Sequence, residues 1–96
     1  MVKVEIKKAC LEERQARKEE LQTELEKLNN EYEKANFEDD MYYWLKQNSS
    51  HYREVFTQKH EEYAKKVDEL DKRKEELNDE IRILEREIDY INNLLK

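Results

Sequence analysis

The sequence predicts an all-α protein: a long antiparallel helical hairpin, or coiled coil, with a C-terminal helix overhang that self-associates. Three observations support this fold class. A heptad of apolar residues runs through the second half, charged residues make up 46% of the chain, and its 96 residues include no glycine and no proline. Average composition would give a chain of this length about eleven of those two residues. One helical domain, residues 1–96, is therefore expected.

The heptad consists of two interleaved sets of positions, each repeating every seven residues. One set is Phe56, Tyr63, Leu70, Leu77, Leu84 and Ile91, and the other is His60, Val67, Lys74, Ile81, Ile88 and Leu95. Alternating steps of three and four residues keep both sets on one face of a helix. Because such a stripe needs a second helix to cover it, the pattern predicts helix pairing.

Composition and charge exclude several classes of function. Hydrophobic residues make up only 36% of the chain, too few for a thick globular core, and the net charge of −6 includes no uniformly basic stripe. Direct nucleic-acid binding is therefore not expected. No apolar run is long enough to cross a membrane, and Cys10 is the single cysteine. We expect a soluble, intracellular, cytoplasmic protein without a disulfide.

The first predicted helix spans residues 3–35, approximately. Its clearest stripe is Leu21, Leu25, Leu28, Tyr32 and Ala35. Upstream, the same register passes through Lys7, Arg14 and Lys18, whose long side chains can lie along an open seam with their charge in water. Val2, Val4 and Ile6 also alternate with charged residues, which is the period of a β-strand and leaves a short strand as an alternative.

The segment 36–40 is the preferred position for the turn. Asn36 could cap a new helix whose first turn holds Glu38, Asp39 and Asp40 opposite the positive end of the helix dipole. A second candidate is Asn48-Ser49-Ser50, because these side chains compete for backbone hydrogen bonds. The second helix is thus predicted over about 41–96, with a possible interruption near 48–50. The pattern leaves open whether residues 41–47 form a separate helix.

A turn near residue 38 predicts a specific register between the helices. Arg14 would lie near Tyr63, Lys18 near His60, and Val4 near Lys74. Residues 75–96 would then extend beyond the first helix with their apolar stripe uncovered. We expect a homodimer, with a tetramer as the alternative, through Leu77, Ile81, Ile83, Leu84, Ile88, Tyr90, Ile91, Leu94 and Leu95. The pattern does not select a parallel or an antiparallel dimer.

No catalytic, cofactor-binding or metal-ligating set is predicted. His51 and Glu54 lie one turn apart but lack further ligands, and His60-Glu61 lacks the second histidine of a zinc-protease motif. Cys10 has basic neighbours but no base placed by the sequence to activate it. Two thin helices enclose no cavity, so we expect neither an enzyme nor a small-molecule substrate.

An aromatic and acidic cluster is the candidate partner-binding site, with Phe37, Asp39, Asp40, Tyr42, Tyr43 and Trp44 as its predicted residues. Tyr and Trp are common anchors of protein interfaces. Consecutive Tyr42, Tyr43 and Trp44 cannot all point to one side of a helix. The alternative interpretation is a hydrophobic plug that closes the end of the hairpin.

The leading functional hypothesis is a non-enzymatic structural or adaptor coiled coil. It would bind itself through residues 77–95 and an unidentified protein through the aromatic cluster. The alternative is a small acidic inhibitor of the phage type, whose carboxylates would mimic phosphates toward a nucleic-acid-processing enzyme. That inhibitor would need a nearly all-negative face, whereas the mixed charges here predict a mixed one. The helical ending at Lys96 also leaves open a fragment of a longer protein.

Overall fold

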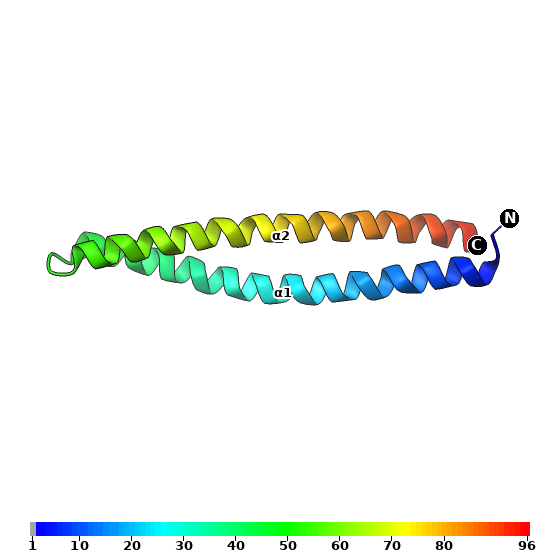
Figure 1. The fold of residues 1–96 in the computed structure, drawn as a ribbon, viewed down its shortest axis with the longest axis horizontal. Coiled ribbons are helices and arrows are strands. Elements are labelled where there is room, and N and C mark those ends of the chain that lie inside the picture. Colours follow the sequence, from blue (N-terminus) through cyan, green and yellow to red (C-terminus); the bar gives the residue numbers. More distant parts are fainter. Residues whose placement is uncertain (1) are drawn as a thin grey trace. The chain divides into compact units, whose positions relative to one another are not determined.

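The computed structural model describes residues 2–96, which form two long helices joined by a short turn (Figure 1). Helix α1 is Val4–Asn48 and helix α2 is Arg53–Leu95. The predicted all-α helical hairpin is confirmed. The strand alternative is wrong, because the amides of Ile6 and Lys7 donate to the carbonyl of Lys3, at 3.1 and 3.2 Å, and begin α1 there.

The chain divides into two compact units, and each pairs a stretch of α1 with an antiparallel stretch of α2. The terminal unit contains residues up to 26 together with residues 75–96, and the turn unit contains residues 27–74. The N-terminal end of α1 and the C-terminal end of α2 therefore lie side by side in the terminal unit (Figure 1).

The turn occupies residues 49–52, so its predicted position at 36–40 is wrong and the second candidate is close to the observed break. Asn48 ends α1 by donating its side-chain amide to the carbonyl of Trp44 at 2.9 Å. The amide of Phe56 donates to the carbonyl of Tyr52 at 3.0 Å and begins α2. No described residue has a positive φ angle, which explains how a turn without glycine is possible.

Residues 36–40 stay helical because none of them breaks a helix and because one local ion pair and contacts with α2 hold them. Lys34 pairs with Glu38 one turn later, with 3.9 Å between Nζ and Oε1. Ala35 is buried against α2, and Asp39 contacts His60 of α2. An asparagine followed by acidic residues thus resembles a helix start locally, but packing decides the outcome.

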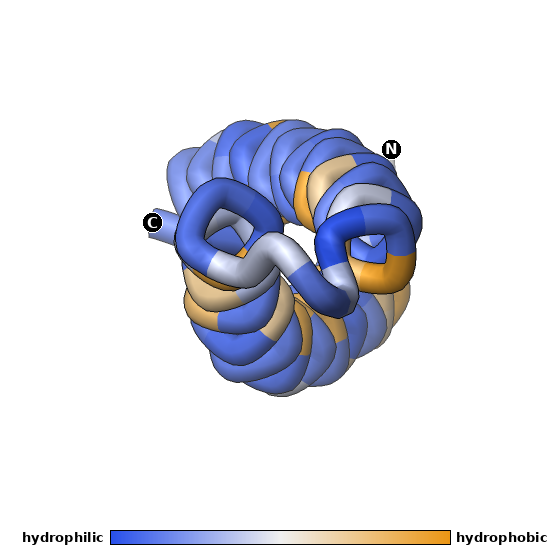
Figure 2. The backbone as a smooth tube through the Cα atoms, turned by 90° about the vertical axis from the view of Figure 1, so that its left-hand side faces the viewer, coloured by the Kyte–Doolittle hydropathy of each residue, from blue (hydrophilic) through white to orange (hydrophobic). Residues whose placement is uncertain are grey.

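The seam between the helices follows the predicted heptad. Every position of both interleaved sets in α2 is buried or half-buried, as are Lys7, Arg14 and Lys18 in α1. The buried hydrophobic residues are Leu21, Ala35, Leu77, Ile81 and Ile88. Figure 2 shows a backbone that is mostly hydrophilic, with hydrophobic positions recurring at intervals, as expected for a narrow seam.

The later turn changes the register and removes the predicted overhang. Arg14 lies beside Glu87 rather than Tyr63, Lys18 beside Glu85 rather than His60, and Lys74 above the ring of Tyr32 rather than beside Val4. Residues 75–96 consequently pack against the beginning of α1 in the terminal unit. The C-terminal stripe already has a covering helix within the same chain.

Candidate protein-interaction surfaces

The nine predicted oligomer contacts divide into three groups by exposure. Leu77, Ile81 and Ile88 are 0%, 7% and 9% exposed, so the hairpin itself already covers them. Leu84, Ile91 and Leu95 are half-buried in the same seam. The remaining three are Ile83, Tyr90 and Leu94, which are 59%, 65% and 47% exposed. They form a second stripe on α2, outside the seam.

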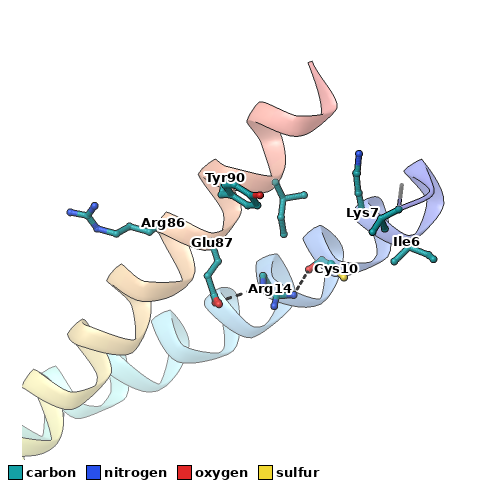
Figure 3. Close-up of a pocket in the computed structure, with 9 residues that line it drawn as sticks. Ile6, Lys7, Cys10, Arg14, Arg86, Glu87 and Tyr90 are labelled. Atoms are coloured by element: carbon teal, nitrogen blue, oxygen red, sulfur yellow. Dashed lines mark hydrogen bonds and ion pairs between the residues drawn. The ribbon is translucent and has the colours of Figure 1, made fainter.

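Tyr90 of this second stripe also lines a groove that reaches the N-terminal residues of the chain. The terminal groove has a volume of about 460 Å³ and lies wholly within the terminal unit. Its lining residues are Val2, Ile6, Lys7, Cys10, Arg14, Arg86, Glu87, Tyr90 and Ile91 (Figure 3). Aliphatic and aromatic side chains form its interior, so the groove suits an apolar ligand surface.

Cationic groups dominate the rim of the terminal groove. Arg14 is engaged there, with 3.6 Å from its Nε to Glu87 Oε1 and 3.2 Å from its Nη1 to the Cys10 carbonyl. Lys7 and Arg86 have no ion-pair partner within residues 2–96. Figure 3 shows Arg86 pointing away from α1, whereas Glu87 and Arg14 reach toward each other. Two free positive charges therefore flank the groove.

Further ion pairs cross the seam of the terminal unit. Arg17 Nη2 lies 3.8 Å from Glu80 Oε2, and Lys18 Nζ lies 3.7 Å from Glu85 Oε1. The cations come from α1 and the carboxylates from α2. Each such exposed pair contributes only about 0–1 kcal/mol to the stability of the hairpin. The surface here carries both signs of charge.

In the turn unit, Tyr42 belongs to the seam. Its ring stacks on Tyr63 with 5.3 Å between centroids and lies 6.1 Å from the ring of Phe56. A hydrogen bond to Glu38, together with the negative charge of that carboxylate, raises the pKa of Tyr63. The half-buried position of Tyr42 matches the plug interpretation better than a free binding surface.

His60 connects three further side chains beside this aromatic group. Its Nδ1 lies 3.1 Å from Lys46 Nζ, and its Nε2 lies 3.1 Å from Asp39 Oδ1. That carboxylate oxygen is enclosed and has no well-directed hydrogen-bond donor among the described residues. The ring of Tyr43 lies 5.4 Å from the imidazole. Asp39 therefore contributes to the seam rather than to an open site.

Phe37 and Trp44 remain free of the seam, and Met41 lies between them. Together they form the outer stripe of α1, with exposed fractions of 69%, 36% and 62% for Phe37, Met41 and Trp44. Their spacing of four and three residues places them on one helix face. Glu33 and Asp40 flank this stripe, are exposed, and have no ion-pair partner in residues 2–96.

The residues considered for metal or thiol chemistry lie apart from one another. His51 is exposed in the turn, with its ring against Tyr52, and His60 is in the seam. Within residues 2–96, no three histidine, cysteine, aspartate or glutamate side chains gather as ligands for a metal ion. Cys10 is a free, half-buried thiol. Neither helix contains an apolar stretch of the length that a bilayer crossing requires.

Among the exposed apolar side chains of these surfaces, Val2, Ile6 and Met41 are not in the set predicted from the sequence, and neither are the charged lining residues Lys7, Arg86 and Glu87. Val2 and Ile6 join the groove only because the turn at 49–52 brings the two chain ends together. Met41 joins the outer stripe only because residues 36–40 are helical and keep it in phase with Phe37. Each signal depends on the position of the turn.

Comparison with known protein families, with curated proteins and with solved structures finds no match for this chain. The features of the chain that bear on function are two surfaces, the terminal groove with its adjoining stripe and the outer stripe of α1.

Proposed function

We propose that this protein is a non-enzymatic protein–protein interaction module, a structural or adaptor coiled coil that self-associates through its terminal unit. The observation that carries this proposal is a set of half-exposed apolar side chains on that unit. They are Val2, Ile6, Ile83, Tyr90 and Leu94, each between 47% and 65% exposed. Scattered exposed apolar residues are ordinary, but contiguous patches of several hundred Å² usually mark interaction sites.

The total exposed area of the chain supports the same proposal. The solvent-accessible surface is 7690 Å² for a mass of 11.9 kDa. A compact monomer of this mass exposes about 6,000 Å². The excess is about twice the roughly 800 Å² that a standard protein interface removes from each partner. Association is thus a physically reasonable way to cover this surface.

The free energy gained by burying these apolar side chains is large enough to contribute to association. Complete burial of one aliphatic or aromatic side chain contributes about 1.5–3 kcal/mol. Five half-exposed side chains would therefore contribute several kcal/mol, which must offset the loss of translational and rotational freedom on association. The mixed charges of Arg17, Lys18, Glu80 and Glu85 on this unit give no support to the decoy inhibitor, which would need a uniformly negative face.

The test is the molar mass of the chain by light scattering over a hundredfold range of concentration. We expect an oligomer for the native sequence and a monomer for the double variant Ile6→Ser, Tyr90→Ser. Val55→Ser is the matched control, because Val55 is 47% exposed but belongs to the turn unit. A native chain that stays monomeric, or a double variant of unchanged mass, would contradict the proposal.

A further inference from the structure

We propose that the terminal groove of one chain receives the outer stripe of a second copy, with Phe37, Met41 and Trp44 as the docking side chains. This inference rests on the proposed self-association and identifies its second surface. The contact would be heterologous, because a groove in the terminal unit of one copy meets a helix face in the turn unit of the other.

The outer stripe has the arrangement of a helix that docks into an apolar groove. Anchors at positions i, i+4 and i+7 lie along one face and enter such grooves together. Phe37, Met41 and Trp44 have this spacing and are all exposed. They point away from the seam, since Phe37 lies about 200° around the helix from the buried Ala35. The hairpin itself therefore makes little use of these side chains.

The dimensions of the two surfaces agree. Phe37 and Trp44 are seven residues apart, which is about 10 Å along a helix axis. On the other surface, the lining residues Ile6 and Arg14 span eight residues, or about 12 Å. A groove of about 460 Å³ can accept the larger parts of two aromatic side chains.

Charge decides between this arrangement and a face-to-face contact of two terminal grooves. The groove is flanked by Lys7 and Arg86, whereas the outer stripe is flanked by Glu33 and Asp40, and none of the four has an ion-pair partner within the described chain. Two grooves facing each other would bring like charges together. A groove facing the outer stripe would pair opposite charges, which gives specificity at an interface.

The fluorescence of Trp44, the single tryptophan, provides the first test. This indole is 62% exposed in the hairpin, so docking would move it from water into an apolar groove. We expect its emission to shift to shorter wavelength with rising concentration, in step with the molar mass. A mass that rises while the Trp44 emission stays unchanged would overturn the inference but leave the proposed self-association standing.

Complementation between two variants provides the second test. Phe37→Ser, Trp44→Ser removes the outer stripe, and Ile6→Ser, Tyr90→Ser removes the groove. We expect each variant alone to self-associate at least tenfold more weakly than the native chain. Their equimolar mixture should form a heterodimer, because one intact groove then meets one intact stripe. A mixture that gains no affinity, or a stripe variant that associates like the native chain, would overturn the inference.

A charge exchange provides a third test, which remains informative if circular dichroism shows that a serine variant has lost helicity. Arg86→Glu should weaken association, and Asp40→Arg should do the same, since each places like charges across the contact. Combining the two substitutions in one chain should recover most of the affinity. Absence of recovery would count against the pairing of these two flanks.

Discussion

Tyr63 shows how one side chain can join the two helices of the turn unit. Its ring stacks on Tyr42 of α1, and its hydroxyl is hydrogen-bonded to Glu38 of the same helix. The carboxylate favours the protonated phenol, so the native state keeps this proton to a higher pH than the unfolded chain does. The contact therefore contributes stability below the unfolded pKa of about 10 and loses it as the pH rises through the native pKa.

Tyr63→Phe should remove this alkaline component of stability. The free energy of unfolding of the native sequence is expected to fall more steeply above pH 10 than that of the variant, because only the native sequence has the shifted hydroxyl. Urea unfolding followed by circular dichroism between about pH 8 and pH 11 measures the difference. Glu38→Gln, which keeps the shape but removes the charge, should reduce the steepness too. Parallel curves for all three proteins would contradict this explanation.

At the scale of the helix, two leucines of α2 differ in their environment, because one lies in the seam and the other on the exposed surface. Leu77 is 0% exposed and Leu94 is 47% exposed. Leu77→Ala should lower the free energy of unfolding by about 2–5 kcal/mol, the usual cost of a cavity left by a buried leucine. Leu94→Ala should change it by less than about 0.5 kcal/mol at low concentration. Urea titration of both variants checks this, and equal losses would mean that Leu77 is not in the seam.

The heptad of α2 could be predicted from the sequence because spacing alone determines which residues share a helix face. His60 and Lys74 were placed in the seam by the same spacing, and both are half-buried there. The position of the turn does not follow from spacing, because two segments of the sequence are both suitable. Asn36 with its acidic neighbours and Asn48 with two serines carry similar local signals, and the difference between them comes from tertiary contacts such as that of Asp39 with His60.

The position of the turn also explains why the candidate site was only partly predicted. A turn near residue 38 leaves Leu77, Ile81 and Ile88 without a partner, and their burial then has to be assigned to a second chain. With the turn at 49–52, α1 covers them. Ile83, Tyr90 and Leu94 lie outside the heptad positions, so either turn leaves them uncovered. The heptad spacing of the sequence could therefore predict that these three residues are exposed.

For the whole molecule, the proposed association couples stability to concentration. Because oligomer formation favours the folded state by mass action, the thermal midpoint should rise with protein concentration. A hundredfold increase should raise it by up to about 10 °C, the upper limit being that of a dimer of this size that dissociates only on unfolding. The groove variant Ile6→Ser, Tyr90→Ser should show no such rise. Scanning calorimetry at several concentrations measures both, and an invariant native midpoint would argue against association.

The narrow seam has a thermodynamic consequence beyond the contacts that it makes. The heat capacity change of unfolding grows with the apolar area exposed, and a compact domain of about 100 residues reaches about 1.2–1.5 kcal/mol/K. A hairpin with five buried hydrophobic side chains among residues 2–96 exposes less new apolar surface when it unfolds. Its stability curve should therefore be flatter than that of a compact domain, so that cooling and moderate warming change its stability only gradually.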